Sequence, residues 1–185
     1  ISKLSRDHMR YIEECLASDF HNSLIAAEIG KTLIPKLIEN NKCELLCELI
    51  KTITKFRVND KSFLKIEPLI EEYWFKEIIS TNIDSATDFA AQDIYSIVLS
   101  RIKEISEKDE HAFSVSAIPT IEDHPQKGHI DEYEVYLIKL ITTSISKLPN
   151  KKEVVEQLLN EELIILKRIA VYFMGIYFDE LKELF

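Results

Sequence analysis

The stretch that most constrains this chain runs from Glu162 to Leu184, where apolar residues cover nearly every side of a helix. Such a helix needs neighbours on several sides. The apolar residues step by three or four positions and form two stripes, the first Leu163, Leu166, Ala170, Phe173, Tyr177, Leu181 and Leu184, the second Ile165, Ile169, Tyr172 and Ile176. The uncharged run within it, Ile169 to Phe178, is too short for a bilayer, which requires about 20 apolar residues. We therefore expect a helix that is buried in protein.

The same helical spacing of apolar residues recurs along the whole chain, and no stretch alternates as a half-buried strand does. The pattern predicts an all-α fold of about eight helices. We expect a kink or a short break just before Pro35, because proline lacks the backbone donor that a helix interior needs. A polar turn is predicted from Val58 to Ser62. The predicted helices run from about Arg6 to Ala17, from Ser18 or Asp19 to Asn40-Asn41, from Cys43 to Phe56, from Pro68 to Ile79, from Asp84 or Ser85 to Ile105, from Asp131 to Leu148, from Asn150 to Leu159, and from Glu162 to Leu184.

Most of the predicted connectors are short, which makes consecutive helices antiparallel neighbours, either in a bundle or in a stack of helical hairpins. Several helices have two apolar faces and there is no obvious central seam, so we favour the stack. The prediction is one domain over residues 1–185, an irregular, HEAT-like α-solenoid without a strict repeat period.

Charge and composition narrow the classes of partner and compartment. The net charge of −9 repels polyanions, so nucleic acid and anionic membranes are disfavoured as partners. The three cysteines fit free cytosolic thiols better than a disulfide framework. We expect a cytoplasmic protein, since the sequence has no signal peptide. Because the chain begins at Ile1 and ends at Phe185, we also expect it to be a fragment of a larger protein.

The long connector from Glu107 to Ile130 is the most unusual segment. Structureless loops of this length are uncommon inside a compact domain, and they are either disordered or specifically packed. Four apolar residues favour packing, namely Phe113, Val115, Ile118 and Ile121. We therefore expect a packed loop.

Part of this loop resembles the helical C-terminal region of large prokaryotic P-loop ATPases of the STAND type, which act in defence and signalling. The matching residues are Pro119, Ile121-Glu122-Asp123-His124, Gln126 and Asp131, together with Leu158-Leu159 and Leu166-Lys167-Arg168-Ile169-Ala170. This chain has Lys167-Arg168 where that family usually has two arginines, and Ala117-Ile118 where it often has Trp-Arg. The resemblance covers residues 114–177. It implies an α-solenoid arm of a nucleotide-driven sensor or defence protein whose ATPase and effector parts lie elsewhere.

Arg168 lies among apolar residues of the last predicted helix, and a buried guanidinium needs acceptors that offset its desolvation. Glu122 and Asp123 are the carboxylates we expect to pair with it, with Pro119 and His124 helping to hold the loop in place. The alternative is that Arg168 extends along the surface and keeps its charge in water.

Other motifs are weaker indications of chemistry. Gly30-Lys31-Thr32 mimics the end of a phosphate-binding loop, but position 25 is Ile instead of the required Gly. Cys43 and Cys47 share one helical face, yet a zinc site needs about four ligands, so buried thiols are the expected explanation. Trp74 is either an interface anchor or a core residue.

The loop also concentrates side chains that ligate metals, and a cation site there is an alternative to a purely structural role. These side chains are Asp109, Glu110, His111, Glu122, Asp123, His124, His129 and Asp131. Because no nucleophile–base pair is visible, we expect no catalytic residues, no metal and no cofactor.

The sequence therefore favours a non-catalytic helical scaffold that recognises or positions a protein partner, or other domains of its own protein, within a larger cytoplasmic machine. The resemblance implies that this machine is nucleotide-driven. The alternative is a self-contained helical enzyme or metal-binding protein built around residues 107–130.

Overall fold

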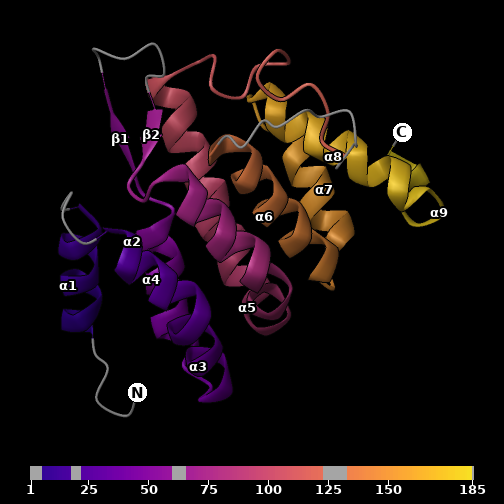
Figure 1. Cartoon of the computed structure of the whole chain (residues 1–185). Helices are drawn as coiled ribbons and strands as arrows, with labels where there is room; N and C mark the ends of the chain where they lie inside the picture. The colour runs from indigo at the N-terminus through magenta and orange to yellow at the C-terminus, as the bar shows by residue number, and fades with distance from the viewer. Residues whose placement is uncertain (1–5, 18–21, 60–65, 123–132, 185) are drawn as a thin grey trace.

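The structure, a computed structural model, describes residues 6–17, 22–59, 66–122 and 133–184. The protein is 76% helical, which confirms the predicted all-α fold. The helices progress across the molecule in chain order, with the two termini at opposite sides (Figure 1). Their bounds are α1 Arg6–Ala17, α2 Asn22–Glu28, α3 Ile34–Glu39, α4 Cys43–Ile53, α5 Glu72–Lys108, α6 Tyr133–Lys147, α7 Lys151–Leu159, α8 Ile164–Ile176 and α9 Phe178–Leu181.

The break expected before Pro35 is confirmed, and it is a π-helical turn from Ile29 to Leu33 between α2 and α3. The N–H of Ile34 donates to the carbonyl of Ile29, one residue further back than in an α-helix. This shift leaves the carbonyl of Gly30 without its usual partner. The side-chain amide of Asn82 on α5 donates to that carbonyl at 3.1 Å, so the irregular turn is satisfied from the neighbouring helix.

Gly30 also lets the π-helical turn approach α5 closely. A Cβ added at Gly30 would lie 3.2 Å from Cγ1 of Ile78, which is tighter than ordinary van der Waals contact. The Gly30-Lys31-Thr32 motif therefore lies in a helix-packing contact and not after a strand, where a phosphate-binding loop would be found.

A short β-hairpin occupies the region that we expected to be a polar turn followed by a helix start. Strands β1 (Phe56–Val58) and β2 (Ile66–Pro68) pair antiparallel, with Arg57 opposite Glu67. Pro68 therefore ends a strand and does not open a helix. The hairpin begins directly after α4, and the N–H of Leu69 donates to the carbonyl of Lys55 at 2.8 Å.

The fourth and fifth predicted helices are both present and meet within α5 at a kink, but the boundary expected at Asp84 or Ser85 is misplaced. The hydroxyl of Ser85 donates to the carbonyl of Asn82 at 3.1 Å, so it bonds back into the preceding turn instead of capping a new helix. The interruption lies further on, at Ala90, whose φ of −144° and ψ of 43° are not helical.

Helix α5 runs through the middle of the molecule, with α2, α3 and α4 on one side and α6 on the other (Figure 1). Helices α7 and α8 then pack on each other beyond α6. Contacts therefore link mainly elements that are near each other in the sequence. That is compatible with a stack of hairpins, although the solenoid interpretation stays a prediction.

A buried polar cluster joins α4, α5 and α6 near the hairpin. Arg101 is buried, donates to the carbonyl of Lys51 at 3.2 Å and pairs with Glu104 at 2.5 Å. The phenol of Tyr133 donates to the carbonyl of Thr54 at 2.5 Å. Burial raises the pKa of Tyr133, so the phenol stays protonated and keeps donating at neutral pH. The cluster satisfies the carbonyl groups at the end of α4.

Candidate functional site

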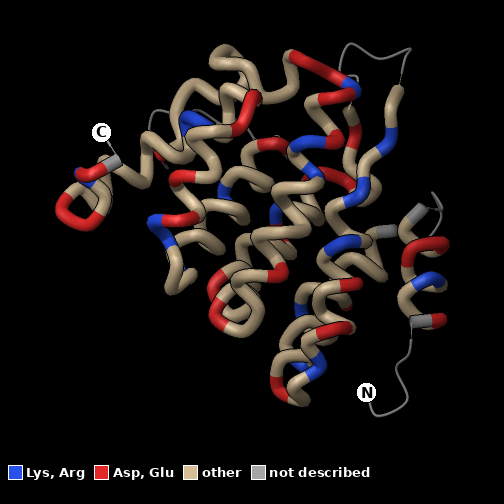
Figure 2. Tube along the Cα trace, turned by 180° about the vertical axis from the view of Figure 1, so that it is seen from behind, with Lys and Arg blue, Asp and Glu red and all other residues tan. Residues whose placement is uncertain are grey.

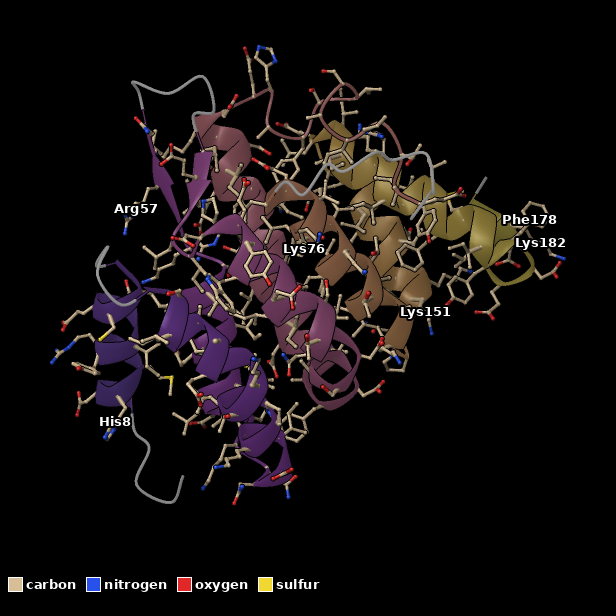
Figure 3. All side chains as sticks on the ribbon, viewed as in Figure 1. His8, Arg57, Lys76, Lys151, Phe178 and Lys182 are labelled. Atoms are coloured by element: carbon tan, nitrogen blue, oxygen red, sulfur yellow. The ribbon has the colours of Figure 1, made fainter. Side chains whose placement is uncertain are left out.

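One face of α8 is largely uncovered within the described residues, apart from Arg168, which contacts the loop at Ile118, although the sequence predicted a helix buried on several sides. Its inner face is packed through Ile165, Leu166, Ile169, Ala170, Phe173 and Met174. On the outer face, Ile164 is 70% exposed and Val171 is 57% exposed. The helix ends at Ile176, and Phe178, 52% exposed, opens α9 after a bend at Tyr177. Figure 3 shows Phe178 at the C-terminal end of the molecule.

The outer residues have the spacing of a surface that packs against one other helix. Within α8, Ile164, Arg168, Val171 and Gly175 follow one another at intervals of four, three and four residues, and Phe178 follows beyond the bend at Tyr177. We call these five residues the α8 seam. This alternation is the heptad spacing with which one helix packs against another. Ile164 and Val171 therefore share one face of α8, and Phe178 lies beyond its C-terminal end.

Gly175 provides an opening within the α8 seam. Nothing lies within 4 Å of the position that a Cβ would occupy there. Gly175 is the last residue but one of α8, and glycine is one residue that proteins use where a backbone or a ligand must approach closely. The fold itself makes no use of the space at Gly175.

A shallow hollow lies beside the seam, between α6 and α8. It is lined by Thr142, Thr143 and Ser146 from α6 and by Tyr172, Phe173, Ile176 and Tyr177 at the end of α8. The rings of Phe173 and Tyr177 are stacked, with centroids 6.0 Å apart. An apolar side chain entering this hollow would meet both aromatic rings and the side chains of Thr142, Thr143 and Ser146.

Arg168, the charged residue of the seam, contacts the long loop as the sequence led us to expect, but through a different group. Its guanidinium donates to the backbone carbonyl of Ile118, and the side chain of Ile118 is itself buried. Within the described residues, no ion pair joins Arg168 to Glu122. The other terminal nitrogen of the guanidinium, Nη1, is buried and has no hydrogen-bond partner among these residues. Burial lowers the pKa of Arg168. The pairing expected with Asp123 concerns a residue outside the described part of the chain and stays a prediction.

The loop is packed over its described length, 109–122. Ala112, Phe113 and Ile118 are buried, whereas Val115 is exposed. The segment crosses from the end of α5 towards α8 (Figure 1). Pro119 and Glu122 are exposed on it, and His124 and the downstream part of the proposed loop cation site lie outside the described residues.

We expect Arg168→Met to lower the free energy of unfolding by about 1–3 kcal/mol, because hydrogen bonds to charged groups contribute that much and the carbonyl of Ile118 loses its donor. Chemical denaturation measures the change. The matched control is Lys167→Met, at an exposed neighbour whose side chain forms no hydrogen bond or ion pair within the described residues, and for it we expect a change within about 0.5 kcal/mol. Equal effects of the two substitutions would mean that apolar side chains alone hold the loop.

Trp74, the remaining residue singled out from the sequence, is partly buried and packs against the core. Its ring meets that of Tyr73 edge to face, with centroids 5.1 Å apart, and Tyr73 is the more exposed of the two at 61%. The structure therefore gives Trp74 contacts on its own helix and in the core.

The structure also brings together three ligand-type side chains that the sequence did not connect. Asp93 on α5 lies beside Cys43 and Cys47 on α4, and the sulfur and carboxylate atoms of the three lie within 4.8 Å of one another. The thiol of Cys43 donates to Asp93 at 3.7 Å. The pKa of the Cys47 thiol is raised to about 12, mainly by burial and to a smaller extent by the nearby Cys43 and Asp93. Because Asp93 is 50 residues away from Cys43, no local motif could have indicated this cluster.

Comparisons with protein-family models, with curated proteins and with solved structures find no match to this chain. None of the helices in the described ranges combines the length and the apolar character that crossing a membrane requires.

Proposed function

We propose that this protein is a non-catalytic helical scaffold that positions a protein partner by packing the α8 seam against one amphipathic α-helix of that partner. The observations that carry the proposal are the exposed Ile164 and Val171 on one face of α8, the exposed Phe178 beyond its end, and the open position at Gly175. Exposed apolar surface of this kind marks interaction sites on soluble proteins. Amphipathic helices dock onto partners through apolar residues at such regular intervals.

Charges beside the seam define the chemistry of the partner helix. Lys167 lies next to the seam near its start and Asp179 next to it near its end, and both are exposed. Neither forms an ion pair within the described residues. Charged residues that flank a seam select the partner and its orientation. The partner helix should therefore carry an acidic residue opposite Lys167 and a basic residue opposite Asp179.

A partner of a different kind is preferred over a second copy of this chain. Two copies with a net charge of −9 each repel one another. Lysine and arginine positions are interspersed with acidic positions along the described helices (Figure 2). The described helices therefore offer no continuous basic track that could follow a phosphate backbone, which disfavours a nucleic-acid role.

The resemblance to the helical arms of STAND-type ATPases extends this proposal. On that basis the chain would belong to a larger cytoplasmic, nucleotide-driven sensor or defence protein, and the partner helix could come from another domain of the same protein. The parent open reading frame decides this extension: a nucleotide-binding domain upstream supports it, and an open reading frame without one contradicts it.

A photo-crosslinking amino acid in place of Ile164 tests the docking itself, in cells that make the protein naturally. We expect one dominant adduct that maps to the apolar face of a helix with the charges described above. The control places the same amino acid at Glu156, an exposed position of α7, where no such adduct should form.

The companion variant Gly175→Gln separates docking from folding. It should abolish the adduct without lowering stability, because the site of the new side chain is empty in this fold. Adducts to a second copy of this chain, adducts spread over many proteins, or an adduct that survives Gly175→Gln would contradict the proposal.

A further inference from the structure

We propose that Cys43, Cys47 and Asp93 form a binding site for a borderline-to-soft divalent cation of the zinc class, with one coordination position left open. The inference is independent of the docking surface on α8, because the cluster lies between α4 and α5.

The geometry of the cluster is close to that of a tetrahedral metal site. Zinc binds thiolate sulfur at about 2.3 Å and carboxylate oxygen at about 2.0–2.2 Å, which places sulfur and oxygen about 3.5 Å apart and two sulfurs about 3.8 Å apart. The sulfur of Cys43 already lies 3.7 Å from the carboxylate of Asp93. All three ligand atoms lie within 4.8 Å of one another. Small side-chain rotations are therefore enough to enclose a cation.

The positions of the ligands on their helices support the same assignment. Cys43 is the first residue of α4, an end of the helix at which its dipole stabilises negative charge. Cys47 follows one turn later on the same face, and Asp93 faces both from α5. Two thiolates and one carboxylate make up the kind of sulfur-rich set that zinc and cadmium prefer over magnesium or calcium.

A disulfide between the two cysteines is a poorer explanation. Side chains four residues apart on a helix have their Cβ atoms about 5–6 Å apart, whereas a disulfide needs about 3.8 Å. Both cysteines are free thiols here.

Binding is a proton exchange whose charges balance. The cation displaces one proton from each thiol, and both protons leave to solvent, as metal binding to thiols requires. Asp93 contributes an oxygen lone pair from its ionised carboxylate. Three negative ligands and a divalent cation leave a net charge of −1 at the site, and the fourth position takes a water molecule.

The test uses the reduced, purified chain, with cadmium as the spectroscopic probe and zinc as its competitor. We expect one equivalent of cadmium to produce sulfur-to-cadmium charge-transfer absorption in the ultraviolet and to raise the melting temperature, and we expect zinc to displace it. Cys43→Ser and Cys47→Ser should each weaken cadmium binding by roughly tenfold or more and diminish the absorption band.

Two further variants make the outcome decisive. Cys15→Ser, which removes the remaining thiol on α1, should bind cadmium like the original chain. Asp93→Asn changes an exposed side chain and should weaken binding by roughly tenfold while the thiolate band remains at saturation. No saturable band near one equivalent, a band that survives both cysteine substitutions, or unchanged affinity in Asp93→Asn would overturn the proposed site.

Discussion

Replacing Phe75 with alanine is expected to lower the free energy of unfolding by about 3–5 kcal/mol, the range found when a buried aromatic ring is truncated. Phe75 is fully buried near the start of α5. Its ring centroid lies 5.0 Å from that of Tyr133 and 6.4 Å from that of Tyr136, both on α6. The cavity would therefore open in the contact between α5 and α6, to which the remaining helices are attached on either side.

Tyr133→Phe separates the ring from its hydrogen bond in the same contact. The substitution keeps the packing against Phe75 but leaves the buried carbonyl of Thr54 without its donor, so we expect a loss of about 1–3 kcal/mol. Chemical denaturation gives the free energy of unfolding for both variants. The control is Tyr73→Ala, which removes an exposed aromatic ring on α5 near Phe75 and should cost less than about 1 kcal/mol. A loss of less than about 1 kcal/mol in Phe75→Ala would contradict the α5–α6 packing described here.

Apolar periodicity was enough to predict the helices, because each buries a face that repeats every three or four residues. The break before Pro35 was predicted from proline itself, because the effect of its missing backbone donor is local. Apolar periodicity failed to predict the strands Phe56–Val58 and Ile66–Pro68, because three-residue strands are too short to show an alternating pattern. It also failed at Ser85, where the choice between capping and back-bonding depends on the direction of the side chain.

The candidate sites were predictable only in part, for a related reason. The sequence identified Arg168 and the loop as partners, but the acceptor is the backbone carbonyl of Ile118, and every residue offers such a carbonyl. Asp93 reaches Cys43 and Cys47 only because α5 packs on α4. The apolar character of the last helix was evident from the sequence. Which of its faces the chain itself leaves uncovered could be seen only once the neighbours α6 and α7 were in place.

The exposed face of α8 should be the surface whose solvent accessibility differs most between the purified protein and the cell. Val171 lies at the centre of the α8 seam, between Ile164 and Phe178, and its side chain is open to solvent in the chain alone. The central residues of an interface lose their contact with water when the partner binds. A cysteine at this position should therefore react quickly with a maleimide in the purified protein and slowly in the native assembly.

The rate of maleimide labelling of Val171→Cys, compared between the purified protein and cells that make it naturally, is the most direct measurement of docking at this surface. Peptide-resolved mass spectrometry separates residue 171 from the three native cysteines, and Glu156→Cys on α7 corrects for access of the reagent. The predicted result is labelling at residue 171 that is roughly tenfold or more slower in the cell, while residue 156 is unchanged and Gly175→Gln restores the fast rate. Equal corrected rates at residue 171 in the two settings would contradict the docking of a partner helix on α8.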